Sequence, residues 1–292
     1  MGNDTHFSNR QYTAYSVFLG VFFLIGFGAQ VIAILALRRN ENRSKKLTLY
    51  WLNLAACNIV VIMASFPISF ASAVNHEYVV KEVGCQVSGF FAGLGCIASL
   101  INIPFSTIKI YYTITSQKAN NVVFAQVWSR HSDRFAIAGI WFYSILCIIP
   151  PLVGWGSFGY EAGQTNCAPN WQGNAFSQRS YSLFLVVAAF LMPILVSCVY
   201  LRKIYKHFEN INTVIQDGYK KAQILSSKQV SLIVAMMLVS CVIGWTPYAI
   251  YTVISALSGS NIYNTTSSLI ISVLAKSSFT YNPLLFLCFC KR

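Results

Sequence analysis

The sequence has few charged residues and very few acids. Only 10% of its 292 residues are charged and 55% are hydrophobic, whereas soluble domains carry roughly a quarter charged residues. All eight acids lie outside the long apolar stretches of the chain: Asp4, Glu41, Glu77, Glu82, Asp133, Glu161, Glu209 and Asp217. This composition excludes an ordinary soluble domain and is typical of a membrane protein.

Apolar stretches long enough to cross a bilayer recur along the chain. A helix of about 20 apolar residues spans the hydrocarbon core. The sequence holds seven such stretches, near residues 15–37, 49–73, 86–114, 135–153, 181–201, 229–254 and 267–290. We therefore predict an all-α membrane protein, in which residues 1–292 form one domain, a bundle of seven transmembrane helices.

The segments between these spans are short, with two exceptions. One is an outer loop near residues 154–180, and the other is a basic, polar cytoplasmic loop near residues 203–227. Prolines inside the spans remove backbone hydrogen bonds and are expected to kink the helices: Pro67, Pro104, Pro193, Pro247 and Pro283.

Basic residues gather on one side of the predicted bundle. The net charge is +13, and most of the 21 lysines and arginines follow the first, third and fifth spans or close the chain. Only Arg10, Lys81 and Arg179 lie on the opposite side. The positive-inside rule then predicts an outer N-terminus and a cytoplasmic C-terminus, and it explains the charge without a nucleic-acid partner. Asn3 and Asn264 begin glycosylation sequons on the predicted outer side.

Two of the nine cysteines, Cys85 and Cys167, face the oxidising outer compartment in this topology, and the others fall within spans. We predict that these two form a disulfide that ties the outer loop to the outer end of the third span. The alternative is a pair of free thiols.

The seventh span contains a lysine, Lys276, near its middle. Charged side chains at this depth are costly, so they are rare and usually functional. A structural lysine would need a carboxylate on a neighbouring helix, but the predicted spans contain none. A desolvated amine can also act as a nucleophile and condense with an aldehyde. This chemistry favours a covalent carbonyl ligand over an unpaired structural lysine, and both interpretations stay open.

Six residues after Lys276 comes Asn282-Pro283, and in this combination the chain resembles the animal opsins, the retinal-binding branch of the rhodopsin-like G-protein-coupled receptors. Further matching motifs occur in the family's order, and the resemblance covers essentially the whole chain. These motifs are Leu52–Asn58, Gly89–Gly95, Trp141 with Pro150–Trp155, and Gly244–Tyr248.

The resemblance implies a light-sensing receptor of a plasma or photoreceptor membrane, with a heterotrimeric G protein as partner. It implies that 11-cis-retinal is bound to Lys276 as a Schiff base and covered by the outer loop. The residues expected to line the retinal are Ser88, Ala92, Gly93, Cys96, Trp245, Tyr248 and Ser272.

The charge that balances the Schiff base is not where opsins usually carry it. The third-helix acid position is Ser88, and the second-helix alternative is Ser69. Glu161, six residues before Cys167, is the candidate counterion, acting directly or through Ser88 and water. A chloride ion beside Ser88 and a neutral Schiff base are the alternatives.

The cytoplasmic end of the third span also departs from the family, since Lys109-Ile110-Tyr111 stands where opsins have an acid, an arginine and a tyrosine. Ile110 offers no donor to a G protein, and Lys109 is expected to add charge to a basic face, so weak coupling is expected. Other departures are Gln30, Asn58, Tyr200, Ser227 and Phe286.

Three functions therefore compete. The first is a light-activated receptor, and the second is a retinal photoisomerase or a weakly coupling light absorber. A receptor for a diffusible amine is less favoured, because Ser88 replaces the aspartate that such receptors use. The histidines fall in the predicted tail and loops, so we expect neither a metal site nor hydrolytic catalysis: His6, His76, His131 and His207.

Overall fold

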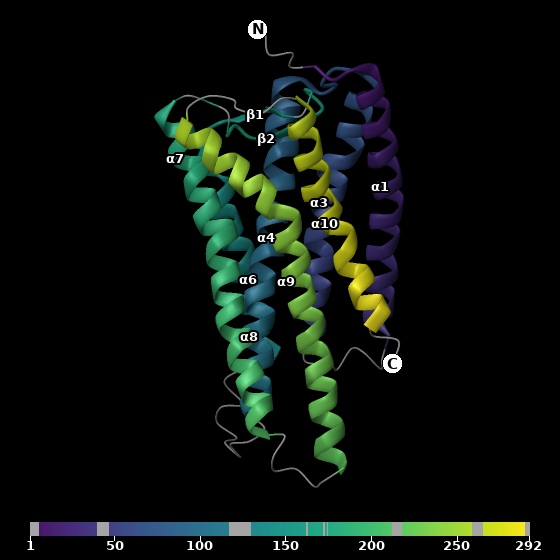
Figure 1. Ribbon diagram of the computed structural model, residues 1–292, viewed down its shortest axis with the longest axis vertical. Coiled ribbons are helices and arrows are strands. Elements are labelled where there is room, and N and C mark those ends of the chain that lie inside the picture. Colours follow the sequence, from purple (N-terminus) through teal and green to yellow (C-terminus); the bar gives the residue numbers. More distant parts are fainter. Residues whose placement is uncertain are drawn as a thin grey trace.

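The computed structural model describes residues 6–39, 47–116, 130–161, 163–171, 173, 175–211, 218–258 and 265–289. Within them, seven helices form an elongated bundle, and a short β-hairpin crosses one end (Figure 1). The helices are α1 (Asn9–Arg38), α3 (Thr48–Asn75), α4 (Lys81–Ser116), α6 (Arg130–Ile148), α7 (Phe176–Leu185), η2 (Val186–Leu191), α8 (Met192–Ile211), α9 (Gly218–Ser258) and α10 (Thr265–Phe289). The segments α7, η2 and α8 follow one another without a break and make up one helix of the bundle.

Each predicted span coincides with one of these helices, so the predicted seven-helix class is confirmed. Five helices of the described part are long and apolar enough to cross a bilayer: 9–38, 48–75, 81–115, 176–210 and 227–258. The other two predicted spans correspond to α6, which a short helix η1 (Pro150–Val153) follows, and to α10.

The helices on either side of the predicted cytoplasmic loop are longer than their apolar parts. α8 continues to Ile211 and α9 already begins at Gly218, so the expectation of a loop at 203–227 is wrong. His207 accordingly lies in α8 and His131 in α6, rather than in loops. Hydropathy marks only the part of a helix that meets lipid, and a polar helix can continue into water without changing that signal.

Close backbone contact and buried amides join the helices in the middle of the bundle. A Cβ at Gly95 of α4 would lie only 2.7 Å from the carbonyl oxygen of Cys57 on α3, so glycine permits this approach. Asn53 donates to the side-chain oxygen of Asn102 (3.0 Å), and the Trp141 indole donates to Asn53 (2.8 Å). These bonds link α3, α4 and α6 inside an otherwise apolar core.

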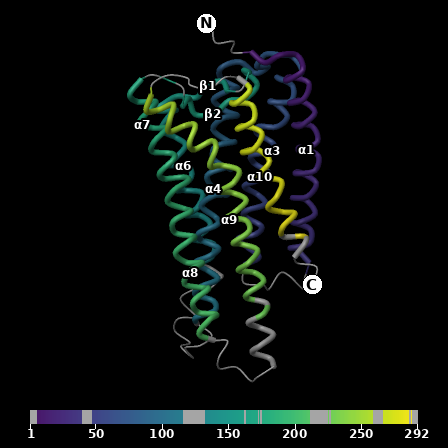
Figure 2. The backbone as a smooth tube through the Cα atoms, in the orientation of Figure 1, coloured from purple at the N-terminus to yellow at the C-terminus, as the bar shows by residue number. Residues whose placement is uncertain are grey.

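The hairpin consists of β1 (Phe158–Glu161) and β2 (Asn166–Pro169), which pair antiparallel. The predicted disulfide between Cys85 and Cys167 is present and joins β2 to α4. A Cβ at Gly89 would meet the Phe158 ring at 2.8 Å, so the hairpin lies directly against the helix. Figure 2 shows that α1 begins at the hairpin end of the bundle and that α10 ends toward the other.

One helix contains a wide turn. η2 is a π-helical segment that ends just before Pro193. Proline cannot donate the usual backbone hydrogen bond, and π turns are a known local adjustment within helices. This turn brings Val186, Ala189 and Phe190 to the wall of the cavity described next.

Candidate ligand-binding site

A cavity of about 180 Å³ lies between the helices, beneath the hairpin. Its wall is mainly apolar, and most of the predicted lining residues belong to it: Ala92, Gly93, Cys96, Trp245, Tyr248 and Ser272. Lys276 of α10 and Glu161 of β1 also line it. An elongated apolar ligand that carries one reactive polar group suits such a cavity.

The Lys276 amine lies against α3. Its Nζ donates a hydrogen bond to the Ser65 hydroxyl and lies 5.3 Å from the centre of the Phe66 ring. Among the described residues, no carboxylate lies within ion-pair distance of Lys276, unlike Lys109, which pairs with Asp133. The amine is therefore held by a neutral partner. Ser65 was missed at the sequence level, where Ser69 was taken as the relevant position of this helix.

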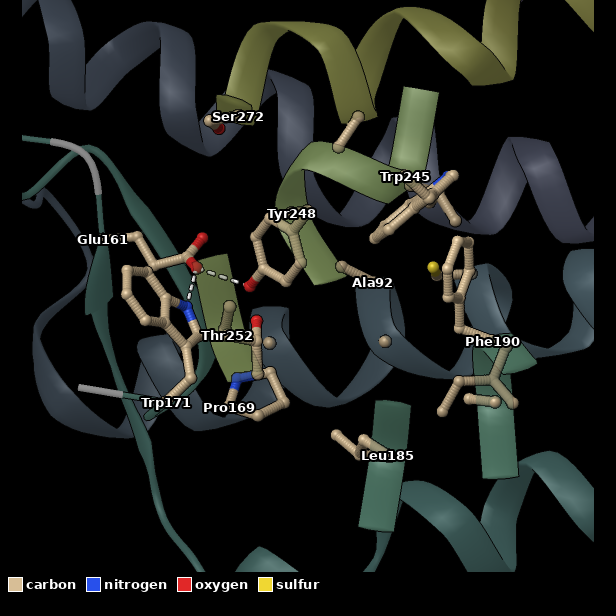
Figure 3. Close-up of a pocket in the computed structure, with 18 of the residues that line it drawn as sticks. Ala92, Glu161, Pro169, Trp171, Leu185, Phe190, Trp245, Tyr248, Thr252 and Ser272 are labelled. Carbon is tan, nitrogen blue, oxygen red and sulfur yellow. Dashed lines mark hydrogen bonds between the residues drawn. The ribbon is translucent and has the colours of Figure 1, made fainter. Parts of the chain in front are cut away.

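Glu161 is held on another side of the cavity, at the hairpin. Its Oε1 accepts a hydrogen bond from the Tyr248 hydroxyl (2.6 Å) and another from the Trp171 indole, as Figure 3 shows. Burial raises the pKa of the Glu161 carboxyl, while the bonds from Tyr248 and Trp171 and the charge of Lys276 oppose that rise. No sequence motif pointed to Trp171.

A second polar cluster fixes β2 above the cavity. The Asn166 amide donates to the hydroxyls of Tyr15 (2.7 Å) and Ser272 (3.1 Å) and accepts from Ser69. All four side chains are buried, and they join β2 to α1, α3 and α10. Ser272 lies one turn before Lys276, so the cluster links the hairpin to the helix that carries the amine. In the sequence, the only indication that Asn166 takes part in such a cluster was its position next to Cys167.

Ser88 does not line this cavity, contrary to expectation. Its hydroxyl lies 2.6 Å from the Tyr78 hydroxyl and donates to the Cys85 carbonyl. Ser88 lies outside the cavity because the neighbouring residue, Gly89, occupies the face of α4 that borders the cavity. The described contacts of Ser88 therefore include no link to Glu161.

Aromatic side chains enclose the end of the cavity away from Glu161. The Trp245 ring lies 5.7 Å from Tyr248 and 6.0 Å from Phe279, and its indole donates to Ser278 (3.1 Å). In Figure 3, Phe190 and Trp245 lie together, away from the Glu161 carboxylate. Such rings form a suitable wall for a flat, conjugated molecule.

At the opposite end of α4, the surroundings of Lys109 differ from the expectation that it adds charge to a basic face. Lys109 is 5% exposed and its Nζ lies 2.7 Å from Asp133 Oδ1, so it does not add free charge to the cytoplasmic face. Tyr50 also donates to Asp133 (3.2 Å). The sequence argument missed this pair because Asp133 lies just before the predicted start of its span, in the first turn of α6.

The structure also shows the surroundings of other residues that differ from the opsin pattern. Ile110 is buried in an apolar cluster. Gln30 donates to the backbone carbonyl of Phe279 (3.0 Å), and Asn58 is fully buried. Tyr200 packs against Tyr111, with 5.6 Å between ring centres. The Phe286 side chain and both sequon asparagines, Asn3 and Asn264, lie outside the described residues.

Comparison with known proteins gives consistent matches. Residues 29–286 match a family described as 7 transmembrane receptor (rhodopsin family). Melanopsin-A of Gadus morhua is 27% identical over 92% of this chain and 49% of that protein, so the chain spans about half of that relative's length. Rhodopsin of Lethenteron camtschaticum is 24% identical over 95% of this chain and 77% of its own.

Two further matches agree with these. The green-sensitive opsin of Gallus gallus is 27% identical over 91% of this chain and 74% of its own length. The crystal structure of squid rhodopsin superposes with a TM-score of 0.87 at 20% identity, covering 96% of this chain and 82% of that one. At that identity the structural likeness establishes the fold alone.

Proposed function

Because the chain belongs to the rhodopsin family of seven-transmembrane receptors, we propose that it is a light-sensing opsin that binds retinal through Lys276 and signals to a G protein. The observation that carries this proposal is an amine in an apolar, aromatic-walled cavity, with no carboxylate of the described residues paired to it. The names of similar proteins, which include a rhodopsin and a green-sensitive opsin, support it.

The residues present fit retinal. When bound, retinal supplies an aldehyde that can react with an amine and a conjugated chain that changes shape on absorbing light. Lys276 is the nucleophile of the cavity, and the surrounding apolar wall excludes water from it. Trp245, Tyr248 and Phe279 provide flat contact surfaces, and the hairpin closes the cavity on the outer side. The 11-cis form and the covalent bond are both parts of this proposal.

Glu161 is the proposed counter-charge for a positively charged Nζ. It is the acid that lines the cavity, and bonds from Tyr248 and Trp171 stabilise its ionised form. A chloride ion beside Ser88 is the rival. Ser88 borders a different hollow, however, which weighs against that position. A neutral Nζ with Glu161 merely buried is the third alternative.

A second candidate function concerns signalling. It is a retinal photoisomerase or a weakly coupling opsin, and the observation that favours it is Ile110, buried where the family has arginine. In either case we propose that the N-terminus lies outside, in a plasma or photoreceptor membrane, as the distribution of basic residues supports.

Replacing Lys276 tests the proposal. The purified chain incubated with 11-cis-retinal is expected to gain a visible or near-ultraviolet absorption band that shifts on illumination. Lys276→Ala should gain none, although it folds, because the nucleophile is gone. Lys81→Ala, which alters an exposed lysine at the outer end of α4, should behave as the unaltered chain. A retained retinal band in Lys276→Ala refutes the proposal.

A further inference from the structure

One hydroxyl on the wall of the cavity has no hydrogen-bond partner. Among the described residues, buried hydroxyls without a partner belong to Thr252, Ser255 and Thr280, and of these only Thr252 lines the cavity. The Thr252 side chain is 4% exposed. A hydroxyl buried in this way costs free energy, because it has lost its bonds to water and gained none in exchange. It is therefore available to a group that enters the cavity.

The other hydroxyl-bearing residues of the cavity wall are already engaged. Ser65, Ser182, Tyr248 and Ser272 each form a hydrogen bond within the protein. The remainder of the wall is mainly apolar. In pockets of this kind, a few polar groups at fixed positions determine which ligand fits. Thr252 thus supplies one open hydrogen-bonding position in a wall that otherwise satisfies its own hydroxyls.

The cavity extends across the bundle from the helix beside Lys276 to the opposite wall. Lys276 Nζ is bonded to Ser65 on α3, and the opposite wall includes Leu185 of α7 and Phe190 of η2. In Figure 1, α3 and α7 lie on opposite sides of the bundle. A ligand joined to Lys276 therefore extends from α3 toward α7, and its other end lies against this opposite wall.

Thr252 belongs to this part of the cavity, away from the amine. It lies on α9, which packs against α7. The hydroxyl of the preceding residue, Tyr251, is 2.8 Å from that of Ser268 on α10, so Thr252 is turned away from α10 by about a quarter of a turn. In Figure 3, Thr252 lies beside Pro169 of the hairpin. Its hydroxyl is thus placed to meet the end of the ligand that is not joined to Lys276.

We propose that the cavity selects a retinal whose ring carries a hydroxyl group, and that Thr252 is the residue that recognises it. The inference rests on the proposed function and narrows the class of ligand. Retinal has its aldehyde at one end and its ring at the other, so a hydroxyl on C3, the ring carbon opposite the chain, extends furthest from Lys276. Such a hydroxyl can donate to Thr252 Oγ1 or accept from it. An unsubstituted ring leaves Thr252 unpaired, and a site of this kind disfavours the ligand that lacks the bonding group.

Competition between two aldehydes tests this selection. Each chain in lipid nanodiscs is kept in the dark with equal amounts of 11-cis-retinal and 11-cis-3-hydroxyretinal, both in excess, until the composition of the bound ligand is constant. Borohydride then reduces the Schiff base. Mass spectrometry of the peptide that contains Lys276 measures the ratio of the two adducts, which differ by one oxygen atom.

The variants separate the hydroxyl of Thr252 from its shape. Thr252→Val keeps the shape of the side chain and removes the hydroxyl, Thr252→Ala also lacks it, and Thr252→Ser retains it. Thr280→Val is the matched control, because Thr280 is likewise a buried threonine without a partner among the described residues, but it lies outside the cavity wall.

The unaltered chain, Thr252→Ser and Thr280→Val are expected to favour the hydroxylated adduct by about tenfold. Thr252→Val and Thr252→Ala should carry the two adducts in nearly equal amounts. Equal amounts in the unaltered chain overturn the inference, as does a preference that both Thr252→Val and Thr252→Ala retain, or one that Thr280→Val loses as well. No adduct of either aldehyde in any chain, the unaltered one included, instead overturns the retinal-binding function and the inference with it.

Discussion

At the scale of single residues, the polar end of the cavity depends on how the Glu161 carboxyl is held. Burial raises its pKa, so it takes up a proton at a higher pH than an exposed glutamate. The Tyr248 hydroxyl bonds to the carboxylate and opposes this shift. Tyr248→Phe in the ligand-free protein should therefore move protonation of Glu161 to still higher pH, as followed by its infrared carbonyl band. Tyr78→Phe, which alters a hydroxyl bonded to Ser88, should leave that pH unchanged.

The charge of Glu161 should also set the colour of the pigment. In Glu161→Gln, the positive Nζ loses its balancing anion and is expected to release its proton, which moves the visible band to shorter wavelength. Absorption spectra with and without chloride measure this. A visible band that stays in place but depends on chloride would assign the counter-charge to the halide and exclude Glu161.

At the scale of helices, the buried Lys109–Asp133 pair joins α4 to α6. Removing one member leaves the other charge uncompensated, so Asp133→Leu should cost about 3–5 kcal/mol of stability. The double variant Lys109→Met/Asp133→Leu removes both charges and should recover most of that loss. Thermal unfolding in one detergent compares the three chains. A double variant as unstable as the single one would show that packing around Asp133, rather than charge, makes the difference.

Helices and local geometry also differ in how far the sequence predicts them. The spans follow from hydropathy and the Cys85–Cys167 bond from the compartment that the two cysteines face, while most of the cavity lining was implied by the resemblance to the opsins. The π turn before Pro193 does not follow, because it is a local change of hydrogen bonding within one helix. The Ser65–Lys276 bond and the outward turn of Ser88 do not follow either, because both depend on the rotation of one helix against another. Periodicity identifies the apolar face of a helix but leaves its rotation uncertain by about one residue, which is enough to exchange Ser88 for Gly89.

At the scale of the whole molecule, a change at Lys276 must reach the opposite end of the bundle to affect a partner. An apolar cluster closes that end, and it includes Ile110 and Ile114 of α4, Ile204 of α8 and Val234 of α9. Receptor activation that moves α9 away from α4 must separate these contacts. Ile110, at the position where the family has an arginine, thus contributes only apolar contacts to this end of the bundle.

Replacing Ile110 with arginine tests whether this end limits coupling. The isoleucine side chain has no polar group to offer once the cluster opens, so Ile110→Arg newly supplies a donor to carbonyl groups of a G protein. The substitution should raise light-driven nucleotide exchange and lower thermal stability, since Ile110 is 4% exposed and the resting state would have to bury the charge. Ile114→Arg, one turn away and 6% exposed, should destabilise similarly without raising exchange. Equal gains in both variants would mean that loosening the cluster is sufficient, and strong exchange by the unaltered chain, unchanged in Ile110→Arg, would mean that another contact carries the coupling.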